Sequence, residues 1–494
     1  MTEAVESAMR DHLLREDGQE DVLIATYVMS TGAERKTALI KNIIFPRDGE
    51  RRVHGNASFT GRYVLRAASE ARAAGDGLIL LHSHPGGAGW QGLSGTDRAT
   101  ESEYERVARG NTRLPLVGMT LGGRDVSWSA RFWFDRDAPV WAESVRTIGP
   151  KFTITWNDGL RRAPRVSRAQ ERTVSSWGES TQRSIARMRV LVVGAGSVGL
   201  DVAQRLAATG VETVGVMDYD GVETVNLDRM VGATRLDAAL GRAKVAVAAR
   251  LMRSASTAEK FEVCQHEVSI CDPEGLRIAL DYDVIFSCVD RPWPRAVLNA
   301  LAYTDLIPVI DGGIALDTFP DGRMRNGIWR AHTLIPGRPC MACIGQLVVG
   351  DVSLDKLGLL EDPEYITGAR REAPSRQNVA VLSASVSSAL LAQFISLAAH
   401  PGGRGTPSPL RYMLSTHTLE HSTAASGIYC SFENAVAAGN DRTPIAEHRD
   451  GWREIVRARS ASRHALRLQV LSALERMLGR AIAHLPPLGD GRAL

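Results

Sequence analysis

A glycine-rich turn at residues 194–199 constrains the fold more than any other feature of this 494-residue sequence. The stretch RVLVVGAGSVG is a short apolar run that enters the turn, and DVAQRLAATG then has the pattern of a helix that ends at Gly210. The next run, TVGVMDYD, is again apolar. Strand, glycine turn, helix and strand in this order predict a βαβ unit that can place a phosphate at the helix N-terminus.

The same alternation continues toward the C-terminus. Apolar runs at DVIFSCVD and IPVIDGGI predict further buried strands, and strands that alternate with helices are typical of a doubly wound parallel sheet. We therefore predict an α/β fold for residues 171–436.

The residues around the glycine turn are candidates for a nucleotide site. Gly194, Gly196 and Gly199 let backbone amides approach a phosphate, and Asp218 ends the next strand, where it can bind a ribose hydroxyl. These four residues suit NAD as well as ATP.

Polar and cationic residues farther along favour ATP. Asn226, Arg229 and Lys244 follow the ribose carboxylate, and a hydride-transfer enzyme has no need of such cations. An adenylating enzyme needs them, because a carboxylate nucleophile and a leaving pyrophosphate are both anionic. Asp290, at the end of a later strand, is a candidate magnesium ligand.

This series of GxGxxG, DxD, NLxR, GxxK and a strand ending in Asp resembles the ThiF/MoeB family of ubiquitin-activating-like adenylyltransferases, over about residues 171–400. The resemblance implies ATP and Mg²⁺ as cofactors and a homodimer. It assigns the ribose to Asp218, the phosphates to Asn226, Arg229 and Lys244, the magnesium to Asp290, and the partner's ATP site to Arg172.

A second constellation lies near the N-terminus. His82 and His84 are two apart at the end of an apolar run, and in a strand this spacing points both imidazoles to one face. Ser94 and Asp97 follow a glycine-rich turn and open a helical stretch. Two histidines, an aspartate and a water would complete a tetrahedral catalytic zinc site.

The motifs HSHP and SGTD resemble the JAB/MPN metalloprotease family over about the first 135 residues, in a mixed α/β domain. The resemblance implies Zn²⁺ bound by His82, His84 and Asp97, with Ser94 stabilising the oxyanion. It also implies a glutamate base before the first core strand. Glu20 is the best candidate for this base, with Asp21 and Glu16 as alternatives in register. A histidine pair without metal, and a metal-bound but idle domain, stay open, since the loop before Ser94 is two residues longer than the family pattern.

The cysteines leave several roles open. Cys340 and Cys343 form a CxxC, which in the ThiF/MoeB family is often half of a four-cysteine zinc site, but Cys430 is the only later cysteine. A zinc site would therefore need a histidine such as His400, His417 or His421. We favour a thioester-forming nucleophile, with a slight preference for Cys340, over a metal or redox pair or simple packing. We expect the remaining three cysteines in the core: Cys264, Cys271 and Cys288.

Composition bounds the possible partners and location. With 59 basic and 56 acidic residues the net charge is +3, so nucleic acid is not an expected partner. Six cysteines suggest a reducing compartment, and neither a secretory signal nor an apolar run of about 18 residues is apparent. We expect a cytoplasmic protein without a membrane partner. Its predicted parts are residues 1–135, a linker at 136–170, the domain at 171–436, and a basic helical tail at 437–494.

Both resemblances imply the C-terminal glycine tail of a ubiquitin-like β-grasp protein as substrate. The expected function is ATP-dependent adenylation of this glycine, with thioester formation, a possible conjugating enzyme, and zinc-dependent cleavage of the same modifier. The alternatives are activation of a sulfur-carrier protein for cofactor or cysteine biosynthesis, and an inactive interaction scaffold.

Overall fold

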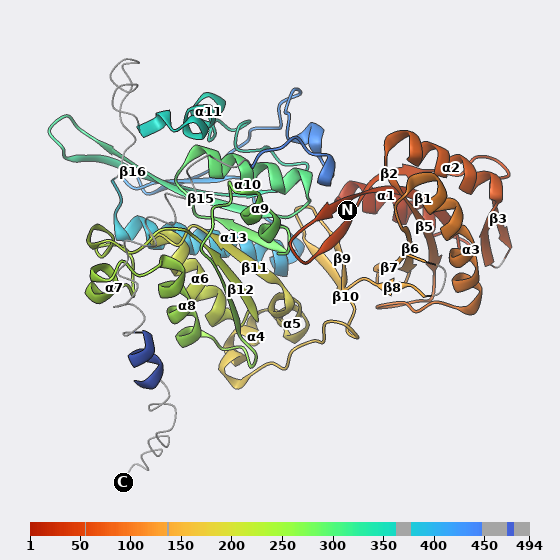
Figure 1. Ribbon diagram of the computed structural model, residues 1–494, viewed down its shortest axis with the longest axis horizontal. Coiled ribbons are helices and arrows are strands. Elements are labelled where there is room, and N and C mark those ends of the chain that lie inside the picture. Colours follow the sequence, from red (N-terminus) through yellow and green to blue (C-terminus); the bar gives the residue numbers. More distant parts are fainter. Residues whose placement is uncertain (55, 136–137, 362–376, 447–471, 479–494) are drawn as a thin grey trace, which may run out of the picture.

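The computed structural model describes residues 1–54, 56–135, 138–361, 377–446 and 472–478. Two α/β units lie side by side, with the N-terminal unit at the right of Figure 1 and the unit that contains the glycine turn at the left. Most of the predicted basic tail lies outside the described residues. Of that tail, residues 472–478 are helical, and Glu475 accepts hydrogen bonds from Arg242 at 2.9 and 3.0 Å.

The N-terminal unit is built on a six-stranded sheet in the order β2-β1-β5-β6-β7-β8. Only the β5–β6 pair is parallel. The strands are β1 (Val22–Thr31), β2 (Lys36–Ile44), β5 (Gly77–His84), β6 (Leu116–Gly122), β7 (Ser127–Trp133) and β8 (Val140–Trp141). A separate hairpin joins β3 (Arg51–His54) to β4 (Asn56–Phe59).

Helices cover both faces of this sheet. Side chains alternate between the two faces along β5. Leu78 and Leu80 pack with α2 (Gly61–Ala74) and α3 (Gly95–Thr112) on one face. Ile79 and Leu81 pack with α1 (Glu3–Leu13) on the other face. The caps follow from the sequence, since Thr60 and Ser94 cap the N-termini of α2 and α3. The mixed α/β prediction for this unit agrees with the structure.

The second unit has an eight-stranded sheet in the order β13-β12-β11-β14-β15-β16-β17-β18. The first five strands are parallel and the last three are antiparallel additions. The strands are β11 (Arg189–Val193), β12 (Thr213–Met217), β13 (Glu262–His266), β14 (Val284–Ser287), β15 (Val309–Thr318), β16 (Met324–Leu334), β17 (Leu410–Met413) and β18 (Thr418–His421). The predicted parallel α/β fold is therefore confirmed, with an antiparallel extension that the sequence analysis did not predict.

Two layers of helices enclose this sheet, as a doubly wound fold requires. One face packs against α6 (Ser197–Thr209), α8 (Lys244–Ala255) and α13 (Ala380–Ala399), and the other against α9 (Pro273–Ala279) and α10 (Pro292–Thr304). Four further helices complete this unit: α4 (Glu171–Trp177), α5 (Glu179–Arg187), α7 (Arg235–Ala239) and α11 (Val349–Leu357).

Helix α13 is long and apolar enough, by length and composition alone, to cross a membrane. Its buried residues Leu382, Val386, Leu390, Phe394 and Leu397 belong to the same apolar cluster as strand β11 and helix α6. A helix whose apolar side chains fill a protein core passes the same test, so we assign α13 to the core.

The predicted linker is partly folded. Strand β8 extends the N-terminal sheet, and β9 (Ser144–Thr147) pairs with β10 (Thr153–Trp156). The side chains of Ile148, Phe152 and Trp156 are buried in the core of the second unit. Burial of these three apolar side chains explains why the segment packs against the second unit and does not form an exposed linker.

The hairpin between β1 and β2 docks on the second unit (Figure 1). Asp283, which is fully buried, accepts hydrogen bonds from Arg35 at 2.8 Å and Arg146 at 3.2 Å. Ser30 donates to Asp305 at 2.7 Å. Burial by itself raises the pKa of Asp283, but the two arginines lower it below its usual value.

We predict that Asp283→Asn destabilises the chain by about 3 kcal/mol, because two largely buried guanidinium groups lose their countercharge. Since the pKa of Asp283 is lowered on folding, its contribution is present above about pH 4 and is lost as the pH falls through the folded value. Urea unfolding at pH 7 and pH 3 measures both effects. Asp317→Asn, at an exposed pair with Arg325, is the control and should cost less than about 1 kcal/mol. Equal effects of the two substitutions would contradict the prediction.

Candidate functional site

The glycine turn has the geometry of a phosphate-binding turn. Gly194 has a φ of 93°, and a Cβ on Gly199 would collide with the carbonyl oxygen of Gly194. Above Gly196 there is open space, and α6 begins at the next residue. The backbone amides of the turn and the N-terminus of α6 therefore face a region that an anion can enter.

Asp218 holds the turn in place. Its carboxylate accepts hydrogen bonds from the amide of Ala195 at 2.7 Å and from the amide of Asp220 at 2.8 Å. Burial raises the pKa of Asp218, and Lys244 opposes this shift. The side chain expected to bind a ribose therefore also positions the phosphate turn.

Lys244 lies among three carboxylates beside the turn. It begins α8, and its Nζ donates to Asp220 at 3.2 Å. Burial lowers the pKa of Lys244, but Asp218, Asp220 and Asp290 together raise it above its usual value. The structure thus brings together a charged amine and three carboxylates, which are oxygen ligands suited to Mg²⁺. Asp220 was not singled out from the sequence, although it is the second acid of the DxD pattern.

Two other phosphate candidates contact their own loop. Arg229 donates to Asp228 at 2.8 Å and to the carbonyl of Val225. The side chain of Asn226 accepts from the amide of Glu223 at 2.9 Å, which caps the short helix η2 (Thr224–Asn226). No contact among the described residues joins either side chain to Lys244. Their expected phosphate role stays a prediction.

Arg172 lies on α4 with an exposed side chain. Its backbone carbonyl accepts hydrogen bonds from Ser175 and Ser176 within the same helix. An exposed position is compatible with the expected contact of Arg172 with the ATP site of a partner subunit. This contact also stays a prediction.

The N-terminal histidines and Asp97 meet at one point. The two Nε2 atoms of His82 and His84 are 3.2 Å apart, and Oδ2 of Asp97 lies 3.7 Å from the first and 4.0 Å from the second. A tetrahedral zinc with bonds of 2.0–2.1 Å needs ligand atoms about 3.3 Å apart. Burial and Arg131 lower the pKa of His82 to about 3, so its imidazole is neutral, as a metal ligand must be. The donor set therefore fits zinc after small adjustments.

Glu20 is the acid next to this triad. It lies two residues before the start of β1, and both His84 and Asp97 act electrostatically on it. Burial raises the pKa of Glu20, and Asp97 adds to this shift, whereas His84 opposes it. The alternative Asp21 is fully buried and pairs with Arg51, and Glu16 is exposed. Its electrostatic interaction with His84 and Asp97 thus favours Glu20 over both alternatives.

Ser94 caps the N-terminus of α3. Its hydroxyl accepts from the amide of Asp97 at 3.1 Å, and its own amide donates to Oδ2 of Asp97 at 3.1 Å. This capping box starts α3 and orients the carboxylate toward the histidines. The expected oxyanion role would use the hydroxyl proton of Ser94, and it stays a prediction.

Gln91, which the sequence analysis missed, orients His84. Its side-chain nitrogen donates to the carbonyls of Ala88 and Gly89 at 2.8 and 3.0 Å, so its oxygen faces Nδ1 of His84 at 3.2 Å. Nδ1 must therefore carry the proton, which leaves Nε2 free to bind a metal. Gln91 lies in the loop before Ser94, so this loop supports the histidine. No local pattern signals this contact.

The cysteines form a three-thiol cluster. The sulfur of Cys340 lies 3.6 Å from that of Cys343 and 3.6 Å from that of Cys430, close to the spacing of about 3.8 Å in a tetrahedral zinc site. Among the described residues the cluster includes no histidine. The expectation that His400, His417 or His421 completes it is therefore wrong.

Gly427 lies beside the sulfur of Cys343, where a second CxxC motif would have its first cysteine. It precedes Cys430 by three residues, its amide donates to Cys343 at 3.3 Å, and a Cβ on it would lie 3.8 Å from that sulfur. The segment thus reads GxxC where a second CxxC would have cysteine. At this position the backbone amide of Gly427 donates a hydrogen bond to Cys343, and among the described residues the cluster has no fourth thiolate.

The cluster also bears on the nucleophile hypothesis. Cys340 is fully buried, and burial raises its pKa to about 12, which disfavours it as a nucleophile. Burial also acts to raise the pKa of Cys343, but the Gly427 amide and the neighbouring thiols lower it overall. Of the three cysteines expected in the core, Cys271 is buried, whereas Cys264 and Cys288 are half-buried. Burial raises the pKa of all three.

We predict that Gln91→Leu weakens zinc binding at the histidine triad about 10- to 100-fold, as loss of an outer-shell partner does. Gln91→Glu keeps an acceptor at Nδ1 and should retain most of the affinity. Chelator competition on a Cys343→Ser background reports this site alone. Tight binding that Gln91→Leu leaves unchanged would contradict the role assigned to Gln91.

We predict that Gly427→Cys supplies the fourth thiolate and strengthens zinc binding at the cysteine cluster at least tenfold. Competition with a chelator, monitored by cobalt substitution and its thiolate absorption bands, measures the change. Gly427→Ser is the control, because its hydroxyl adds bulk without a thiolate. If the serine and cysteine variants bind alike, Gly427 is not at a ligand position.

Comparison with known proteins places the second unit in a family. A model of the ThiF family matches residues 168–419, just over half of the chain. The adenylyltransferase and sulfurtransferase MOCS3 of Caenorhabditis briggsae is 28% identical over 190 residues, which are 38% of this chain and 44% of that protein. The protein of the same name from Xenopus laevis is 35% identical over 124 residues, or 25% of this chain and 26% of that protein. The chain thus spans less than half of the length of these curated relatives.

Solved structures add a weaker likeness. Escherichia coli MccB with ATP is 17% identical, with a TM-score of 0.42, over 54% of this chain and 74% of that chain. A TM-score this low carries no argument, so the family assignment rests on the ThiF match and on the glycine turn that it includes. The chain belongs to the ThiF family.

Proposed function

We propose that the ThiF unit adenylates the C-terminal carboxylate of a ubiquitin-like sulfur-carrier protein with ATP and Mg²⁺. The observation that carries this proposal is the position of Lys244 among Asp218, Asp220 and Asp290 beside the glycine turn. The names of the curated relatives, which are adenylyltransferases and sulfurtransferases, support the same chemistry.

The residues divide this reaction as follows. The carboxylate oxygen of the terminal glycine bonds to the α-phosphorus of ATP, the bond to the bridging oxygen breaks, and pyrophosphate leaves with the electron pair. Lys244 and Arg229 would offset the negative charge that builds on the phosphates. Asp290, with Asp220, would hold Mg²⁺, which supplies further positive charge at the phosphates.

We favour sulfur transfer over an enzyme-bound thioester as the fate of the adenylate. Cys271, Cys340 and Cys430 are buried, and the pKa values of the half-buried Cys264 and Cys288 are raised. The remaining cysteine, Cys343, is one of the three thiols that fit a metal. An acyl adenylate that does not react with Cys343 is available to a sulfur donor from outside. A homodimer and a conjugating enzyme remain parts of the wider proposal, as does a cytoplasmic location.

The N-terminal unit, we further propose, is a JAB/MPN-type zinc peptidase that acts beyond the same glycine. The spacing of His82, His84 and Asp97 supports it, as does the acid Glu20 beside them. Zinc, when bound, supplies a Lewis acid that makes water a better nucleophile. Glu20 would take the proton of the attacking water and pass it to the leaving amine. Having both sites on one chain raises the local concentration of one site near the product of the other.

Pyrophosphate exchange that depends on a small ubiquitin-like protein tests the first proposal. We expect Lys244→Ala to reduce exchange about 100-fold or more, because one group that stabilises transition-state charge is removed. Lys260→Ala, an exposed lysine just beyond α8, is the control and should keep the rate. Exchange that is equal in the two variants, or independent of the ubiquitin-like protein, would contradict the proposal. Mass spectrometry then separates a thiocarboxylate product from a thioester on Cys343.

A fusion of the ubiquitin-like protein to a reporter, joined after the terminal glycine, tests the peptidase proposal. We expect cleavage by the zinc-loaded chain, loss of cleavage on chelation, and a reduction of about 100-fold or more in Glu20→Gln. Glu16→Gln, at the exposed alternative in register, should cleave normally. Zinc binding without cleavage would favour the idle metal-bound domain, and full activity of Glu20→Gln would remove Glu20 from the mechanism.

A further inference from the structure

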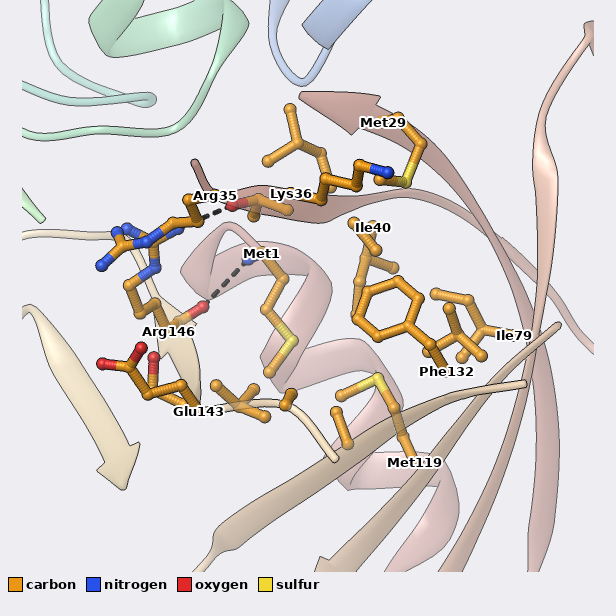
Figure 2. Close-up of a pocket in the computed structure, with 18 of the residues that line it drawn as sticks. Met1, Met29, Arg35, Lys36, Ile40, Ile79, Met119, Phe132, Glu143 and Arg146 are labelled. Atoms are coloured by element: carbon orange, nitrogen blue, oxygen red, sulfur yellow. Dashed lines mark hydrogen bonds between the residues drawn. The ribbon is translucent and has the colours of Figure 1, made fainter. Parts of the chain in front are cut away.

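A cavity of about 320 Å³ lies where the N-terminal unit meets the ThiF unit. Its floor is the face of the N-terminal sheet that also carries α1, formed by Ile40, Ile79, Met119 and Phe132 (Figure 2). Leu306 of the ThiF unit contributes to its wall. Since residues alternate along β5, this floor lies on the opposite face from His82 and His84. The cavity is therefore separate from the site formed by His82, His84 and Asp97.

The walls are apolar and adaptable. Three methionines line the cavity, and the side chain of Met1 projects into it in Figure 2. Methionine side chains repack around ligands of different shape. At the rim, Phe134 and Val140 are 45% and 55% exposed, so the apolar surface continues outward from the cavity. Exposed apolar surface that leads into a pocket is typical of a binding site.

Most charged groups at the edge of the cavity are already neutralised. Arg35 and Arg146 share the buried carboxylate of Asp283, and Glu143 pairs with Arg189 at 3.0 Å. These ion pairs hold the two units together and leave little charge for a ligand.

Lys36 is the exception among the lining residues. It is exposed at the end of the cavity next to Met29 (Figure 2), and no ion pair joins it to another described residue. The amine of Met1 donates to the carbonyl of Arg146 at 2.9 Å, and burial lowers its pKa to about 5, so it carries no charge at pH 7. The mouth of the cavity therefore presents one uncompensated cation.

We propose that this cavity binds a small amphipathic carboxylate, with its apolar chain on the sheet and its carboxylate at Lys36. The volume lies at the lower end of the range for small-molecule pockets. A sugar or nucleotide would leave its polar groups without partners on these walls, which costs free energy. A purely apolar ligand would leave the charge of Lys36 unused. The proposal stands independently of the function proposed for either catalytic site.

Titration calorimetry of the full chain with decanoate tests the proposal, with decyltrimethylammonium as the cation of equal chain length. We expect saturable binding of one decanoate per chain and at least fivefold weaker binding of the cation. Lys36→Glu should weaken decanoate binding about fivefold, the scale of an exposed ion pair, and reverse the preference between the two probes. Lys151→Glu, an exposed lysine that does not line the cavity, should change nothing. Equal binding of both probes would overturn the role of Lys36.

A filling substitution locates the site. Ala38→Phe places a ring in the cavity from β2 and should weaken decanoate binding more than tenfold, whereas Ala74→Phe, exposed on α2, should not. Melting curves of both variants establish that they fold. Undiminished binding by folded Ala38→Phe, or no saturable binding by the parent chain, would overturn the proposal. Self-association that Val140→Glu abolishes would overturn it as well, by showing that a second copy covers the rim.

Discussion

The close approach of strand β11 to helix α6 is the constraint on which the nucleotide half of this protein depends. A Cβ at Gly199 would collide with the carbonyl oxygen of Gly194, so only glycine lets the helix begin so near the strand. Asp218 then fixes the turn through the amide of Ala195 and lies beside Lys244. The carboxylate of Asp218 thereby fixes the shape of the phosphate turn and also interacts with the charge of Lys244.

Sequence patterns predicted those parts of the structure whose determinants lie close together in the chain. The βαβ unit follows from an apolar run and three glycines, and the shared face of His82 and His84 follows from the two-residue period of a strand. Asp97 reaches the histidines because it is the third residue of a capped helix, which SGTD also signals. Lys244 at the start of α8 is a local prediction of the same kind.

The rest depends on contacts between distant residues. Cys430 reaches Cys340 only because the segment after β18 returns to the CxxC turn, and the backbone amide of Gly427 has no signature in a count of cysteines and histidines. The antiparallel strands β16 to β18 extend a sheet whose parallel part alone had a local pattern. Arg229 has the expected spacing, but spacing does not encode its hydrogen bonds to Val225 and Asp228 within the same loop.

Strand β1 links the two halves. Its first residue, Val22, pairs with His82 on β5, and near its other end Ser30 donates to Asp305 of the ThiF unit. The following turn and β2 bring Arg35 to the buried Asp283. A rotation of one unit against the other would break these contacts and expose two buried carboxylates, so the fold opposes it. The glycine turn and the site of His82 and His84 are therefore held at a fixed separation.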